Sequence, residues 1–140
     1  MSDRAPLQPP RALVWWIIWG TQLAGLLVLW WNFGFLKLSG NRPSANPLVD
    51  LVGLLPIFIS IIIRWLVLPR YDEVVRAFAV FIAGVALAEA GGIIGIFLGG
   101  PYRDSLFVLG VLGIAQYVPL FVSRLGRPKG SGFLPNKNGR

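Results

Sequence analysis

The fold is decided by the stretch at residues 83–92, Ala83-Gly84-Val85-Ala86-Leu87-Ala88-Glu89-Ala90-Gly91-Gly92, in which small and apolar residues surround a single carboxyl group. It lies inside a longer apolar segment, residues 74–98. Crossing the hydrocarbon core of a bilayer takes roughly 20 residues at a rise of about 1.5 Å each, so this segment predicts a membrane-spanning helix. A carboxyl group in hydrocarbon must be neutral, paired or turned toward a polar cavity, so Glu89 requires a specific explanation.

Further apolar segments lie on both sides of this one along the chain, at about residues 12–36, 48–68 and 106–122. The stretches between the four segments combine proline or glycine with charged residues, which is where helices stop. The sequence therefore predicts an all-α, polytopic membrane protein with four transmembrane helices in an up-down bundle. The predicted transmembrane domain covers residues 12–123, between an N-terminal tail at 1–11 and a basic tail at 124–140.

Composition supports a lipid environment and excludes several kinds of chemistry. Of 140 residues, 55% are hydrophobic and 14% are charged, whereas a soluble domain carries about 25% charged residues. Cysteine and histidine are both absent. Disulfides, thiolate and imidazole catalysis, zinc-type sites and histidine-ligated haem are therefore excluded, and we expect no cofactor and no metal.

Basic residues predict the orientation in the membrane, because lysine and arginine are retained on the cytoplasmic side. Ten of the 13 basic residues fall on the side of the two termini, and three fall on the other side, namely Lys37, Arg42 and Arg103. Both termini are therefore expected in the cytoplasm. Segment 12–36 has tryptophans near both of its ends and is longer than the apolar core of a signal peptide, so we expect a retained helix.

Small residues along segment 74–98 predict close helix packing. They recur three or four positions apart, which lets two helix backbones approach each other; they are Gly84, Ala88, Gly91, Gly92, Gly95 and Gly99. We favour packing inside this chain's own bundle over an interface with a second copy or another membrane protein. Pro56 and Pro119 fall inside segments 48–68 and 106–122, where each is expected to kink its helix.

Each predicted helix also contributes a polar side chain near mid-depth, and these residues form the candidate site: Thr21, Gln22, Ser60, Glu89, Gln116 and Tyr117. Counted along the helices from the cytoplasmic end, Gln22 lies about 16 Å deep, Glu89 about 20 Å and Gln116 about 12 Å. Because lipid offers no hydrogen-bond partners, we expect these groups to turn inward and bond one another.

Two interpretations of Glu89 stay open. In the structural one, the carboxyl is protonated, because desolvation penalises its charge, and its hydrogen bonds maintain helix register. In the functional one, Glu89 binds a proton or cation, or lines a path for a small solute. Arg64 lies near the cytoplasmic end of segment 48–68, so we expect its side chain to extend to the lipid headgroups.

Enzymatic activity is not expected. Ser39, Ser44 and Ser105 lie in loops or at helix ends, and no histidine is present to activate them. Asp50 and Asp104 lie near the outer surface, too far from Glu89 to form a carboxylate pair.

The sequence instead predicts a small integral membrane protein with a structural, assembly or interaction role, in a bacterial inner membrane. A pathway built around Glu89 is the alternative. The expected partners are membrane lipids, and we expect anionic headgroups to bind the basic tail, residues 124–140. We expect this tail to be unstructured, and we do not expect nucleic acid as a partner.

Overall fold

The computed structural model describes residues 12–34, 48 and 51–124, and the regular structure in these residues is helical. The α-helices are α1 (Ala12–Leu29), α3 (Leu54–Ile62), α4 (Val74–Leu98) and α5 (Arg103–Ala115). Shorter π- and 3₁₀-helical segments extend or connect them: η1 (Trp30–Gly34), η2 (Ile63–Val67), η3 (Leu68–Arg70), η4 (Gly100–Tyr102) and η5 (Pro119–Arg124). The predicted tail 1–11 and the predicted tail beyond residue 124 lie outside the described residues.

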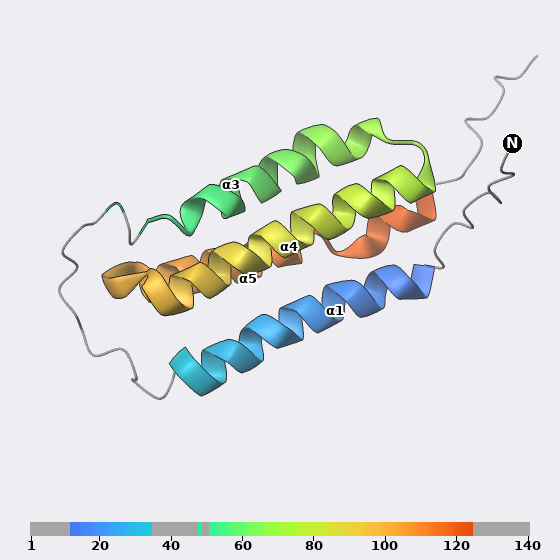
Figure 1. The fold of residues 1–140 in the computed structure, drawn as a ribbon. Coiled ribbons are helices and arrows are strands. Elements are labelled where there is room, and N and C mark those ends of the chain that lie inside the picture. The colour runs from blue at the N-terminus through green and yellow to red at the C-terminus, as the bar shows by residue number, and fades with distance from the viewer. Residues whose placement is uncertain (1–11, 35–47, 49–50, 125–140) are drawn as a thin grey trace, which may run out of the picture.

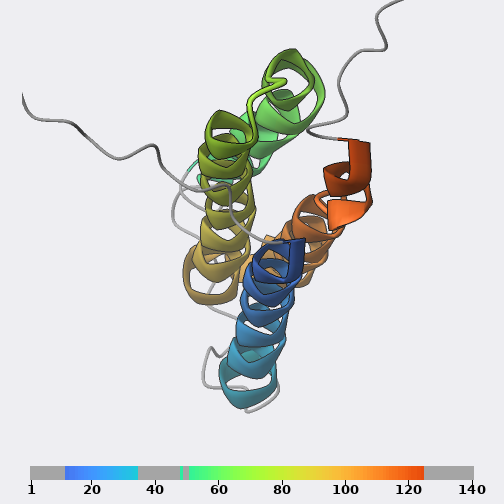
Figure 2. The same ribbon diagram turned by 90° about the vertical axis from the view of Figure 1, so that its right-hand side faces the viewer.

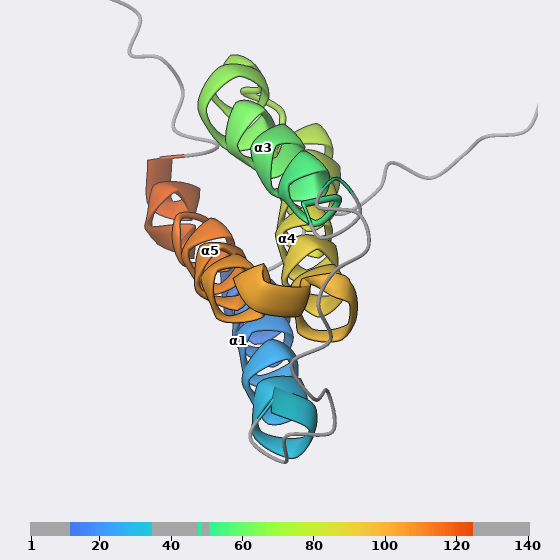
Figure 3. The same cartoon turned by 90° about the vertical axis from the view of Figure 1, so that its left-hand side faces the viewer.

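In the part of the chain that the structure describes, α1, α3, α4 and α5 run alternately in opposite directions (Figure 1). α4 and α5 form the central pair, and α1 and α3 pack on opposite flanks of this pair (Figures 2 and 3). The start of α1, the end of η3 and the η5 segment all lie at one end of the molecule, which we call the η5 end (Figure 1). The arrangement is therefore an antiparallel helical assembly whose centre is the α4–α5 hairpin.

Within the described residues, three segments are long and apolar enough to cross a membrane: Ala12–Phe33, Val74–Leu98 and Gly100–Val122. The all-helical prediction is thus confirmed for the described residues, and three of the four predicted spans meet this criterion. The remaining predicted span, residues 48–68, includes two residues outside the described ones, and its described helix begins at Leu54. A turn precedes this helix, in which the Leu54 N–H donates to the Leu51 carbonyl at 2.9 Å.

Neither Pro56 nor Pro119 has the effect that was expected, a kink within a continuous helix. Pro56 is the third residue of α3, in the first turn, where its missing N–H would have had no acceptor within the helix. Pro119 ends α5 instead of bending it. A proline ring clashes with the carbonyl four residues earlier, and α5 stops at that residue, Ala115. The expected helix 106–122 therefore divides into α5 and η5.

Small residues bring the central helices into backbone contact. A Cβ atom at Gly110 of α5 would lie 2.7 Å from the Gly92 Cα and 3.0 Å from the Gly92 nitrogen, so the two main chains touch there. On the other face of α4, a Cβ at Gly91 would lie 2.8 Å from the carbonyl oxygen of Gly53, just before α3. The predicted packing residues are all buried against this chain's own segments; they are Gly84, Ala88, Gly91, Gly92, Gly95 and Gly99.

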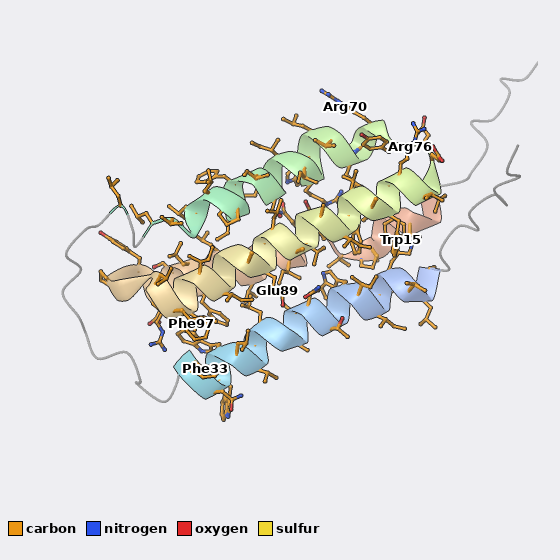
Figure 4. The ribbon with its side chains drawn as sticks, in the orientation of Figure 1. Trp15, Phe33, Arg70, Arg76, Glu89 and Phe97 are labelled. Atoms are coloured by element: carbon orange, nitrogen blue, oxygen red, sulfur yellow. The ribbon has the colours of Figure 1, made fainter. Side chains whose placement is uncertain are left out.

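Aromatic rings hold α1 against the central pair near both of its ends. At the η5 end, the buried Trp15 packs on Phe81 at a centroid distance of 4.9 Å and on Phe121 at 5.6 Å. At the opposite end, Phe33 meets Phe97 of α4 at 5.4 Å (Figure 4). The middle of α1, between these two contacts, carries the polar residues.

Candidate functional site

The structure divides the predicted polar residues into two separate groups. One group lies between α1 and α4 and contains Glu89, which points toward α1 (Figure 4). The other lies where α3, α4 and the end of α5 meet. The sequence shows how deep each residue lies along its helix, but not toward which neighbour it turns.

The first group pairs Glu89 with Gln22. With its amide nitrogen turned toward the carboxyl group, Gln22 donates to Glu89 Oε1 at 2.9 Å and also contacts Oε2. Gly25 lies beside this pair, since a Cβ at that position would be in ordinary van der Waals contact with Glu89 Oε1, at 3.5 Å. Glu89 is half-buried, and no described arginine forms an ion pair with it. Its partner is therefore a neutral amide.

The Gln22 amide suits either protonation state of this carboxyl group. Its nitrogen can donate to a carboxylate, and a half-turn of the amide brings its oxygen to the same place to accept a proton from a carboxylic acid. Glu89 can therefore gain or lose a proton without losing its hydrogen-bond partner.

Thr21 does not join this pair. Its hydroxyl donates to carbonyls of its own helix, to Ile17 at 2.9 Å and to Ile18 at 3.0 Å, and its side chain is exposed. A threonine in a membrane helix commonly satisfies its hydroxyl in this way.

The second group connects three segments through two buried side chains. The Ser60 hydroxyl of α3 donates to the Gly84 carbonyl of α4 at 2.8 Å, and the Tyr117 hydroxyl donates to the Ser60 carbonyl at 2.6 Å. The tyrosine fits because position 84 is glycine: a Cβ there would overlap the phenol, with Cε1 only 2.7 Å away. These bonds tie α3 to the central pair at a buried position.

The break at Pro119 creates an acceptor next to this group. In a continuous helix the Gln116 carbonyl would accept from the N–H three or four residues later, at position 119 or 120. Pro119 has no N–H, and the Leu120 N–H donates to the Val118 carbonyl at 2.8 Å, so neither is available to Gln116. The Nε of Arg64 fills the vacancy at 2.7 Å. The side chain of Gln116 meanwhile accepts from Trp65 Nε1 at 3.2 Å.

Arg64 therefore differs from the expectation that its side chain extends to the headgroups. It is half-buried, and its guanidinium carbon lies 4.9 Å from the ring centre of Phe121 and 5.9 Å from that of Tyr117. Arg64 and Trp65 were not among the predicted site residues. The available signal was Pro119, whose freed carbonyl requires a donor, and arginine is a suitable donor from a neighbouring helix.

Within the part of the chain that the structure describes, no three acidic, histidine or cysteine side chains gather in a way that could hold a metal ion. What the two groups offer chemically is one titratable carboxyl beside an amide, and one guanidinium beside hydrogen-bonded main chain.

Comparisons with known proteins find no matching family model, no matching curated protein and no matching solved structure. The function is therefore inferred from the residues of this chain alone.

Proposed function

We propose that this chain is a small multi-pass membrane protein that serves as a structural or interaction subunit of a membrane assembly. The observation that carries the proposal is the use of its interior polar groups. Ser60, Tyr117 and Arg64 donate to main-chain carbonyls of neighbouring segments, so they act as connections between helices. This arrangement supports a rigid helical body and leaves little reactive chemistry for an enzyme.

The partner surface in this proposal is the outer face of α1 or α3. The small residues of α4 are covered by the chain's own helices, which favours packing inside the bundle for that face. The outer face of α3 is apolar and exposed, with Leu55, Phe58 and Trp65 each at least 60% accessible. A second helix in the membrane can cover such a face without leaving any polar group unpaired.

Four membrane crossings with both termini in the cytoplasm complete the proposal, in a bacterial inner membrane. Arg70 and Arg76 lie at the η5 end, together with the start of α1, while Arg103 lies at the opposite end (Figures 1 and 4). This distribution supports a cytoplasmic η5 end by the positive-inside rule. A reporter fused to the C-terminus tests it, since a reporter active only outside the cytoplasm contradicts the assignment.

Crosslinking tests the interaction role directly, because the chain has no cysteine of its own. We expect Phe58→Cys on α3, or Ile17→Cys on α1, to give a defined crosslinked complex in native membranes. Phe81→Cys, at a fully buried position, is the matched control and should give none. Two results together contradict the interaction role: no crosslinked product from cysteines placed along both outer faces, and a mass of 15.4 kDa, that of one chain, in mild detergent.

A proton or cation site at Glu89 is the second candidate. It is supported by the Gln22 amide, which can serve both protonation states of the carboxyl group. Glu89→Gln keeps the shape and the hydrogen bonding. If the carboxyl is structural, this variant should fold and support growth like the parent; if it binds a proton or cation, the variant should fold but lose that activity.

A further inference from the structure

Arg64 carries a permanent positive charge, and the described residues beside it provide no negative one. Its guanidinium remains protonated under all physiological conditions, and it forms no ion pair with any described residue. The nearest groups are a main-chain carbonyl and three aromatic rings, those of Trp65, Tyr117 and Phe121. Aromatic faces attract a cation but leave its charge in place.

Unused hydrogen-bond donors gather beside this charge. Arg64 uses Nε for the Gln116 carbonyl, and among the described residues its two terminal nitrogens have no hydrogen-bond partner. The Gln116 amide nitrogen also has none, and it is buried. Because Trp65 donates to the amide oxygen, the amide nitrogen lies on the other branch of the same amide group. Two unsatisfied donor groups, one of them charged, therefore lie on the same helix junction.

The surroundings of these donors match a phospholipid. Arg64 lies six residues before Arg70, about 9 Å along the helix from its end, which places it near the border between acyl chains and headgroups. On the side of Arg64 away from the η5 end, Ile62 is 50% exposed and Phe58 is 60% exposed, so apolar surface continues from the donors along the outside of α3. A headgroup phosphate bound at Arg64 could keep its acyl chains on this surface.

We propose that Arg64 and Gln116 form a binding site for the phosphate of an anionic phospholipid. The terminal nitrogens of Arg64 donate to the phosphate oxygens in the paired geometry that guanidinium favours, and the Gln116 amide nitrogen adds a neutral donor. The three rings and the Gln116 carbonyl hold the guanidinium in place. The residues of this site belong neither to the predicted basic tail, residues 124–140, nor to the Glu89–Gln22 pair.

Native mass spectrometry of the full-length protein in detergent, titrated with phosphatidylglycerol, tests the proposal. Phosphatidylcholine and inorganic phosphate are the two comparison arms. We expect Arg64→Gln to weaken phosphatidylglycerol binding about tenfold or more, since hydrogen bonds to charged groups are the strong ones. Arg76→Gln is the matched control: it removes the same charge at the same end, but from an exposed residue paired with Glu73, and should change binding by about twofold at most.

Gln116→Met provides a second variant if Arg64→Gln does not fold. It keeps the carbonyl that Arg64 needs and removes the amide, and it should weaken phosphatidylglycerol binding several-fold. Equal binding by the parent and by every folded variant of Arg64 or Gln116 overturns the site. Equal affinity for phosphatidylcholine also overturns it. If inorganic phosphate displaces phosphatidylglycerol at a concentration equal to that of the lipid, the site binds free phosphate and the lipid assignment is overturned.

Discussion

Replacing Gly110 with alanine tests the backbone contact at the centre of the fold. The new Cβ would lie 2.7 Å from the Gly92 Cα and 3.3 Å from the Ala88 carbonyl oxygen. These are main-chain atoms of α4, so no side chain can rotate away to make room. Because non-bonded carbon atoms prefer a separation of about 3.5–4.0 Å, α4 and α5 must separate by about 1 Å at this point.

The cost of this separation can be estimated. Overpacking in a close-packed interior typically costs about 1–3 kcal/mol. Alanine in place of glycine in a helix returns about 0.5–1 kcal/mol through backbone entropy. Gly20→Ala is the matched control, since it makes the same exchange inside α1, where a Cβ meets nothing within 4 Å. The entropy gain is common to both variants, so the difference between them isolates the overpacking, at about 1–3 kcal/mol.

The measurement is reversible unfolding of the parent and the two variants in mixed detergent micelles, titrated with a denaturing detergent and followed by tryptophan fluorescence. Gly110→Ala should lower the free energy of unfolding relative to the parent, and Gly20→Ala should leave it unchanged or raise it slightly. If both variants unfold within about 0.5 kcal/mol of each other, the α4–α5 interface can relax without cost and the backbone-contact argument fails.

Three further substitutions test other contacts, Gly95→Leu by thermal unfolding and oligomeric state in detergent, and the other two by the same titration with a denaturing detergent. Gly95→Leu should lower thermal stability by several degrees or disrupt the fold, because even a Cβ at this position overlaps Leu106; unchanged stability and oligomeric state would contradict the packing. Tyr117→Phe removes the hydroxyl that donates to the Ser60 carbonyl and should cost about 1 kcal/mol, whereas an equally stable variant would mean that water replaces this bond. Trp19→Phe removes an indole N–H that donates to an α5 carbonyl at 2.9 Å, and it should also cost about 1 kcal/mol. An equally stable variant would show that this hydrogen bond does not help to hold α1 against α5.

Hydropathy and residue spacing predicted the helices and the packing face of α4, because both depend on local periodicity along one helix. The rotation of a helix about its own axis depends on which neighbour it meets. Ser60 and Glu89 therefore appeared as members of one polar group, although they face different helices. Pro119 was expected to kink its helix, but the donor that meets the carbonyl it frees, Arg64, lies 52 residues from Gln116 in the chain and could not be found by local reasoning.

The flanking positions of α1 and α3 have a consequence for how the protein is made. Synthesis proceeds from the N-terminus, so α1 and α3 are made before the α4–α5 hairpin exists. Each obtains its main interhelical contacts from that hairpin, and they lie on opposite sides of it. α1 and α3 therefore lack their main packing partner until α4 has been made. Both can then pack on α4, and the contact between Gly92 and Gly110 forms once α5 has followed.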